Sequence, residues 1–158
     1  MNLKRVVVTG MGAITPLGNT CAQFWRNLRG GLSGAAPITK FDPAGFRTRF
    51  ACEVKGFDPL AHFDSKEARK LDPFCQYALV AAREAVADAG LVPGAIDRTR
   101  AGVIWSSGMG GLVTLQEQLI DYAGRRGSPR FNPFFIPKII ANMAAGLISI
   151  EHGFQGVN

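Results

Sequence analysis

The sequence predicts an α/β fold in which helices cover a mostly parallel central sheet. Two apolar runs, residues 5–10 (RVVVTG) and 101–106 (AGVIWS), each lead into a glycine-rich turn. Runs of this kind are typical of strands buried on both faces. Segments with helical spacing of apolar residues follow each run, and strands that alternate with helices favour a parallel sheet.

The composition indicates one globular domain over residues 1–158. Hydrophobic residues make up 47% of the chain and charged residues 19%, which allows a sizeable core. No apolar run reaches the ~18 residues that a membrane helix requires, and the first residues have no cleavage-site pattern. We therefore expect a cytoplasmic protein with no membrane partner.

The net charge of +6 favours an acidic partner. The basic residues are not interleaved with aromatic ones as on a nucleic-acid surface, so we expect no nucleic acid. A negatively charged carrier protein or a phosphorylated cofactor fits the charge equally well. The cysteines (Cys21, Cys52, Cys75) are too widely spaced for a metal site and fit small buried residues, and His62 and His152 stand beside no candidate nucleophile.

The first glycine-rich turn, GMGAITPLGN, leads into a helix expected over residues 21–29. Thr20 and Gln23 have the spacing of a capping box at its start, and RGGLSG ends it. The turn is similar to a dinucleotide-binding fingerprint. However, Thr15 stands where the third glycine is needed, and no acidic residue ends a second strand about twenty positions later. A tight turn explains the glycines better.

The middle of the chain predicts a strand over residues 49–54 (RFACEV) and two helices. Ser65 can cap a short helix over residues 66–71. Asp72 can cap the next one, with Pro73 in its first position and Gly90 at its end. The inward face of this second helix consists mostly of small residues, which implies that another segment packs closely against it: Cys75, Ala78, Ala82, Val86 and Ala89.

After the predicted strand at residues 101–106, apolar spacing predicts a helix from Leu112 to Ala123 and a final helix over residues 137–150. The loop between them contains two adjacent phenylalanines flanked by prolines. This pattern indicates a rigid apolar loop that another surface buries. Asn142 falls within the final helix and needs a hydrogen-bond partner if it is buried.

Several segments occur together in a specific order: RVVVTGMGAITPLGN, SGAAPITKFD, FACEVKGFDP, KEARKLDPFCQYAL, SSGMGGL and NPFFIPKIIANMAAG. In order and spacing they resemble the N-terminal part of the β-ketoacyl-[acyl-carrier-protein] synthases, the condensing enzymes of fatty-acid synthesis. The resemblance covers residues 3–157. It implies a thiolase-like layered fold, α-β-α-β-α in the complete enzyme, which is a homodimer, with this chain covering most of the first half.

The resemblance also implies roles for particular residues. Gly108 and Met109 resemble the lining of the acyl pocket, and Phe135 and Ile136 resemble residues that reach across the dimer into the partner's pocket. On charge alone, the basic residues of the 66–71 helix fit a solvated surface. The family likeness instead implies docking of acyl carrier protein, in acyl and malonyl forms, by Lys66, Arg69, Lys70 and Arg130.

No catalytic residue is assigned to this chain. Gly153, Gly156 and Asn158 match a family turn, with Val157 in place of the usual proline. The family's nucleophilic cysteine, two histidines and lysine are therefore expected beyond Asn158, and the chain is expected to be truncated before the nucleophile and inactive alone. The family reaction, a decarboxylative condensation that forms 3-oxoacyl carrier protein, needs no cofactor. Alternatives are a non-catalytic partner that sets chain length and a binding or assembly module.

Overall fold

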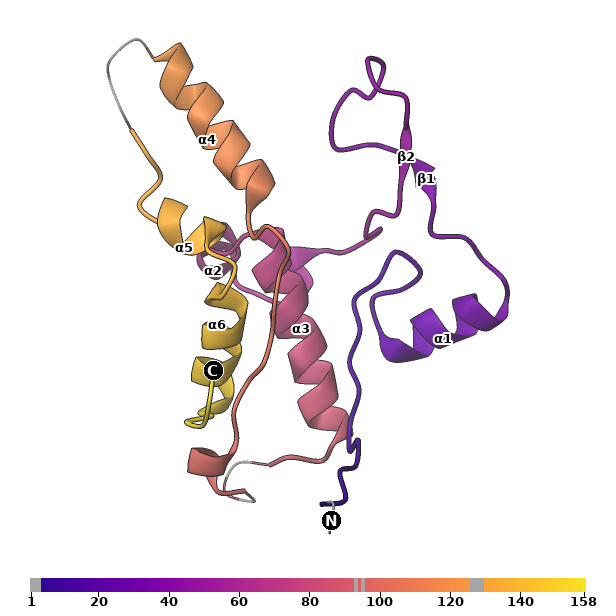
Figure 1. The fold of residues 1–158 in the computed structure, drawn as a ribbon, viewed down its shortest axis with the longest axis vertical. Coiled ribbons are helices and arrows are strands. Elements are labelled where there is room, and N and C mark those ends of the chain that lie inside the picture. The colour runs from indigo at the N-terminus through magenta and orange to yellow at the C-terminus, as the bar shows by residue number, and fades with distance from the viewer. Residues whose placement is uncertain (1–3, 93, 95, 126–129) are drawn as a thin grey trace. The chain divides into compact units, whose positions relative to one another are not determined.

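The computed structural model describes residues 4–92, 94, 96–125 and 130–158 (Figure 1). They form two compact units, the first from residues 4–57 and 80–91 and the second from residues 58–79 and the described residues after 91. No helix in these ranges is long and apolar enough to cross a membrane. The elements are α1 (Cys21–Arg29), β1 (Ala36–Pro37), β2 (Phe50–Ala51), α2 (Ser65–Lys70), α3 (Pro73–Asp88), α4 (Leu112–Gly124), α5 (Phe135–Ile139) and α6 (Met143–His152), with 3₁₀ turns at Pro59–Ala61 and Arg98–Arg100.

In the first unit, α1 begins and ends where the sequence predicts. The Thr20 hydroxyl accepts the Gln23 N–H at 3.1 Å, and the Gln23 side chain accepts the Asn19 N–H at 3.0 Å. These bonds satisfy donors that have no partner within the helix. The predicted 49–54 strand is much shorter, because β2 pairs with β1 over two residues only, Ala36 with Ala51 and Pro37 with Phe50.

The glycine-rich turn packs directly on the second half of α3, within the first unit. A Cβ atom on Gly10 would lie 2.5 Å from the backbone nitrogen of Ala89, and one on Gly12 would lie 2.7 Å from that of Ala85. Small residues of α3 therefore do allow a close approach. The contacts are with Ala81, Ala85 and Ala89, and of the predicted face these contacts include Ala89 alone. Three backbone N–H groups donate to two carboxylates of α3, each at 2.9 Å: Met11 to Asp88, and Ala13 and Cys21 to Glu84.

In the second unit, helix α2 begins one residue earlier than predicted. Asp64, rather than Ser65, is its cap, since one carboxylate oxygen accepts the N–H groups of Lys66 and Glu67 at 2.7 and 2.8 Å. These hydrogen bonds lower the pKa of Asp64. Asp72 caps α3 as expected and accepts the Phe74 N–H at 3.1 Å. The buried apolar residues of this unit are Phe63, Cys75, Ala78, Leu79, Ala144, Ala145 and Ile148.

The prediction of one final helix is wrong, because two helices, α5 and α6, meet at a break before Met143. The Ile139 carbonyl accepts the Gly111 N–H at 3.4 Å, so a tertiary bond ends α5. Asn142 is exposed at this break and needs no buried partner. As predicted, the apolar run stops at Gly153, which takes the left-handed conformation with φ of 67°.

Neither predicted buried strand forms a β-ladder among the described residues. Val6 is 89% exposed, Val8 82% and Ile104 95%. Residues 101–106 do share two backbone hydrogen bonds with residues 156–157, from Gly156 N–H to Ala101 at 2.7 Å and from Val103 N–H to Val157 at 2.9 Å. A strand needs a neighbouring strand for its hydrogen bonds and for burial, and residues 4–10 have none in the described part of the chain.

Candidate functional site

The two segments predicted to line an acyl pocket lie side by side in the second unit. The turn that carries Gly108 and Met109 is closed by a 3.0 Å bond from the Gly110 N–H to the Ser107 hydroxyl. Gly110 has a φ of +64°, and a Cβ atom there would overlap the Ile139 carbonyl oxygen of α5. Glycine is therefore required at this point both for its conformation and for the close approach.

A second glycine continues this contact. A Cβ atom on Gly111 would overlap the Lys138 carbonyl oxygen and lie 2.8 Å from a carboxylate oxygen of Asp72. Asp72 is buried, and the same oxygen accepts the Thr114 hydroxyl of α4 at 2.5 Å. The start of α3, the start of α4 and the end of α5 therefore meet around one carboxylate.

The apolar side chains at this junction are open on one side. Met109 is 69% exposed and Ile136 is exposed, whereas Phe135 is half-buried. Among the described residues, no atom other than those of Gly108 and its chain neighbours lies within 4 Å of the position that a Cβ on Gly108 would occupy. The side chains of Met109 and Ile136 are therefore available to an apolar partner.

Phe135 belongs to a column of three aromatic rings. Tyr122 of α4 stacks on Phe131 with the ring centroids 5.3 Å apart and the planes at 22°. Phe131 stacks on Phe135 at 5.3 Å and 29°. Offset stacking at such distances is favourable. The column connects α4 to the first residue of α5.

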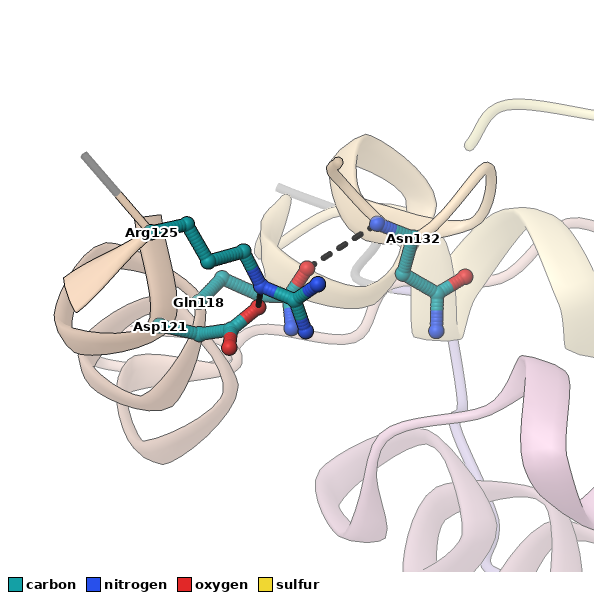
Figure 2. Close-up of polar contacts among 4 residues, drawn as sticks. All are labelled: Gln118, Asp121, Arg125 and Asn132. Atoms are coloured by element: carbon teal, nitrogen blue, oxygen red, sulfur yellow. Dashed lines mark hydrogen bonds and ion pairs between the residues drawn. The ribbon is translucent and has the colours of Figure 1, made fainter. Parts of the chain in front are cut away.

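A backbone connection accompanies the rings. The Gln118 side chain of α4 accepts the Asn132 N–H at 2.9 Å (Figure 2). Asn132 in turn accepts the Phe134 N–H with its side chain and the Phe135 N–H with its carbonyl, both at 2.8 Å. Asn132 therefore starts α5 while it is itself held by α4.

The predicted docking residues of α2 are exposed, and one of them lies next to this loop. Lys66, Arg69 and Lys70 all point into solvent, and the Lys70 ammonium lies 5.5 Å from the centre of the Phe134 ring. This is the geometry of a cation–π contact. Basic charge and the apolar loop therefore form one continuous region of the second unit.

The arginines near the loop differ in their surroundings. Arg125 pairs with Asp121, one helical turn earlier, at 2.7 Å (Figure 2). The hydrogen bond and charge of Asp121 raise the pKa of Arg125. Arg130 is exposed, and Arg126 lies outside the described residues. Arg125 is thus occupied by its own helix.

The cysteines and histidines do not form a reactive cluster in the described part of the chain. Burial and the nearby Asp72 carboxylate raise the pKa of the Cys75 thiol to about 12, and burial with Glu84 and Asp88 raises that of Cys21. His62 is exposed, and His152 stacks on Phe154 at 5.5 Å. No group of three His, Cys, Asp or Glu side chains in the described ranges could hold a metal ion.

Sequence reasoning missed Gln118, Tyr122 and Asn132. The Asn132–Pro133 pair was a usable signal, because Asn before Pro favours a turn that starts a helix. Gln118 and Tyr122 are four residues apart and share a face of α4. Their contact with residues 131–132, however, crosses the loop and has no periodic signature.

The chain is similar in sequence to known proteins. A family model described as "Beta-ketoacyl synthase, N-terminal domain" matches residues 3–158. A 3-oxoacyl-[acyl-carrier-protein] synthase 2 of Synechocystis is 46% identical over 98% of this chain and 37% of its own length. The Coxiella burnetii protein of the same name is 42% identical over 100% of this chain and 38% of its own.

Solved structures give the same result for the fold. A Beta-ketoacyl synthase from Burkholderia phymatum matches with a TM-score of 0.79 at 25% identity, over 98% of this chain and 38% of its own. The ishigamide ketosynthase/chain length factor matches with a TM-score of 0.76 at 33% identity, over 96% of this chain and 38% of its own. The ketosynthase complex AntDE:AntF matches with a TM-score of 0.75 at 25% identity, over 97% of this chain and 40% of its own.

This chain spans a little over a third of the length of the relatives it matches. The extended segments, the helices between them and the glycine turns correspond to one portion of a thiolase-like fold. The chain belongs to the beta-ketoacyl synthase family, as its N-terminal domain.

Proposed function

We propose that this chain provides the substrate-binding portion of a condensing enzyme of fatty-acid synthesis. The reaction joins an enzyme-bound acyl group to malonyl carrier protein, with loss of carbon dioxide, to give 3-oxoacyl carrier protein. The observation that carries the proposal is the contact between an exposed basic helix and an apolar loop beside an open turn: Lys70 lies against Phe134, next to the element that bears Phe135.

The chemistry itself is assigned to residues outside this chain. In the family reaction a cysteine thiolate takes the acyl group from the carrier thioester. Malonyl carrier protein then loses carbon dioxide with the help of two histidines, and the carbanion attacks the acyl thioester. The buried Cys75 thiol, with its pKa near 12, is unsuited to that role. The isolated chain is therefore expected to form no acyl-enzyme.

The apolar residues at the junction bind the acyl chain. Gly108 and Met109 line the pocket, where the bulk of a side chain limits the length admitted. Phe135 and Ile136 reach into the pocket of a second subunit in a homodimer. The exposure of Met109 and Ile136 supports this assignment, because exposed apolar groups beside a fixed turn form a surface for an apolar partner.

The basic residues bind the carrier protein. Lys66, Arg69 and Lys70 lie on a short helix whose start is held by Asp64, and Arg130 adds charge beside the loop. The structure named AntDE:AntF is described as an acyl-carrier protein in complex with its ketosynthase, which supports the same class of partner here. Such an enzyme would act in the cytoplasm.

A second candidate is a non-catalytic partner that sets chain length, and one finding favours it. The ishigamide relative is named a ketosynthase/chain length factor and is 33% identical to this chain. The residue about seven positions after Asn158 distinguishes the two. Cysteine there supports the enzyme, and glutamine or alanine supports the partner.

The test uses the complete synthase with Lys66, Arg69 and Lys70 changed to Glu. Carrier-protein binding should weaken mainly through a slower association rate, and the salt dependence of the rate should decrease. The matched control reverses Arg26, Arg29 and Lys40, which are exposed in the first unit. Unchanged association of the first variant at low salt would remove α2 from the docking surface.

A second test concerns the pocket. Met109→Phe adds bulk, so kcat/KM should fall more for long acyl chains than for short ones, because one methylene in such a site is worth roughly 1–3 kcal/mol. Met109→Leu, of similar volume, is the control. Equal losses for short and long chains would place Met109 outside the pocket.

A further inference from the structure

We propose that Phe131 and Gln118 are positioning residues that hold Phe135 and thereby set the range of acyl lengths accepted. The inference rests on the proposed function for its kinetic consequence, while the contacts themselves belong to this chain. We call Gln118, Tyr122, Phe131 and Asn132 the α4–α5 clamp. It acts on Phe135 through both the ring and the backbone.

The ring contact is specific to position 131. Phe131 is the middle ring of the column, 5.3 Å from Tyr122 on one side and 5.3 Å from Phe135 on the other. Removing it takes away the ring that bridges Tyr122 of α4 and Phe135. The neighbouring Phe134 has no ring contact of this kind in the described structure and lies instead under Lys70.

The backbone contact acts at the same place. Gln118 accepts the Asn132 N–H at 2.9 Å (Figure 2). The Asn132 carbonyl accepts the Phe135 N–H at 2.8 Å. A displacement of Asn132 therefore moves the first residue of α5 directly. Both connections originate four residues apart on one face of α4.

Helix α5 depends on such support. It has five residues, too few to be stable alone. At its last turn the Gly111 N–H donates a hydrogen bond to the Ile139 carbonyl, and at its first turn the clamp holds it. With the clamp removed, the end that carries Phe135 and Ile136 loses its fixed orientation while the other end stays attached.

A purely structural role would give a different result. Loss of packing alone lowers stability and affects all substrates alike. A positioning role changes the ratio of kcat/KM between long and short acyl chains, because Phe135 contacts only chains long enough to reach it. The half-exposure of Tyr122 and Phe131 also shows that the column is not deep core.

The kinetic experiment uses the complete synthase. Phe131→Ala removes the middle ring, and Gln118→Leu removes the acceptor at similar size. Each should change the long-to-short ratio of kcat/KM about fivefold or more, as expected for a misplaced pocket side chain. Phe131→Tyr and Gln118→Glu keep the ring and the acceptor and should restore the ratio to within about twofold. A ratio unchanged in both disruptive variants would overturn the proposal.

A spectroscopic experiment tests the clamp without turnover. 4-Fluorophenylalanine placed at Phe135 should give a ¹⁹F resonance that shifts in Phe131→Ala and does not shift in Phe154→Ala. This control variant removes the Phe154 ring, which stacks on His152 elsewhere in the second unit. An unshifted signal in Phe131→Ala would show that Phe131 does not hold Phe135.

The two readouts separate the possible failures. If the wild-type synthase forms no 3-oxoacyl product, the proposed function fails and the length-setting claim fails with it, while the ¹⁹F shift still decides whether the clamp exists. If the synthase is active and the ¹⁹F signal shifts without a change in the ratio, only the length-setting role is lost.

Discussion

Two segments that the sequence predicts to be buried differ sharply in this structure. In the first half of α3, Cys75 is 1% exposed and Ala78 is fully buried. In residues 5–10, Val6 and Val8 are almost fully exposed. Residues 5–10 were expected to form a strand buried on both faces, and α3 was expected to bury the face that carries Cys75 and Ala78.

The difference follows from how the two backbones satisfy their hydrogen bonds. A helix makes its own bonds and needs other segments only to cover its apolar face. A strand leaves all of its bonds to neighbouring strands, and those neighbours also supply the cover. Residues 5–10 have no such neighbour among the described residues, so their apolar side chains stay in solvent.

The largest expected effect comes from studying the 158-residue chain alone. Each uncovered Val or Ile forfeits about 1.5–3 kcal/mol, and a domain has only about 5–15 kcal/mol of stability. We expect the isolated chain to be insoluble or molten, since exposed strand segments favour aggregation. Co-expression with the remaining portion of the synthase should restore a cooperative thermal transition.

A sharp transition from the isolated monomer, with dispersed amide signals, would contradict this expectation. It would mean that helices α1–α6 alone supply enough burial, and that the contrast between the two segments has little energetic weight.

The buried half of α3 can be tested by thiol labelling of the complete protein. With a pKa of about 12, about one Cys75 thiol in ten thousand is ionised at pH 8. Alkylation of Cys75, followed by peptide mass spectrometry, should be at least about a hundredfold slower than that of the exposed Cys52. Labelling in guanidinium is the control and should remove the difference.

The same raised pKa has a consequence for stability. The folded state keeps the Cys75 proton where the unfolded state has lost it, so the unfolding free energy should fall as pH rises from about 9 toward 12. Cys75→Ala should reduce that slope.

In the labelling experiment, equal labelling rates of Cys75 and Cys52 would show that this part of α3 is accessible.

A smaller effect is expected where the glycine turn packs on α3. In the complete synthase, Gly12→Ala would place a Cβ atom against the Ala81 carbonyl and the Ala85 nitrogen, so denaturant unfolding should show a loss of about 1–3 kcal/mol. Gly45→Ala has no atom within 4 Å and should change stability by less than about 0.5 kcal/mol. Similar values for both would mean that the turn is not tightly packed.

The smallest effect concerns a local cap. Thr20→Ala removes the acceptor of the Gln23 N–H at the start of α1 and should cost about 1 kcal/mol. Thr20→Ser keeps the hydroxyl and should be close to wild type. A loss in both variants would point to the Thr20 methyl group rather than to the cap.

Much of the fold and part of the site could be read from the sequence. The bounds of α1, the cap of α3 at Asp72 and the stop at Gly153 follow from side chains that bond to nearby backbone groups. The shift of the α2 cap to Asp64 is of the same local kind, because two adjacent residues could both act as caps. The order of motifs identified the family that the family model confirms.

The sequence by itself thus determined α1, the cap of α3 and the stop at Gly153, because each depends on residues within a few positions of one another. It also determined the family, because the order of several motifs along the chain is specific. Only the tertiary structure decided the break between α5 and α6, the Gln118–Asn132 bond and the ring column on Phe135. It also showed that residues 5–10 have no β partner among the described residues. These features depend on contacts between segments that are distant in the chain. The spacing of residues along the sequence does not reveal which carbonyl, ring or strand edge from a distant segment will come into contact.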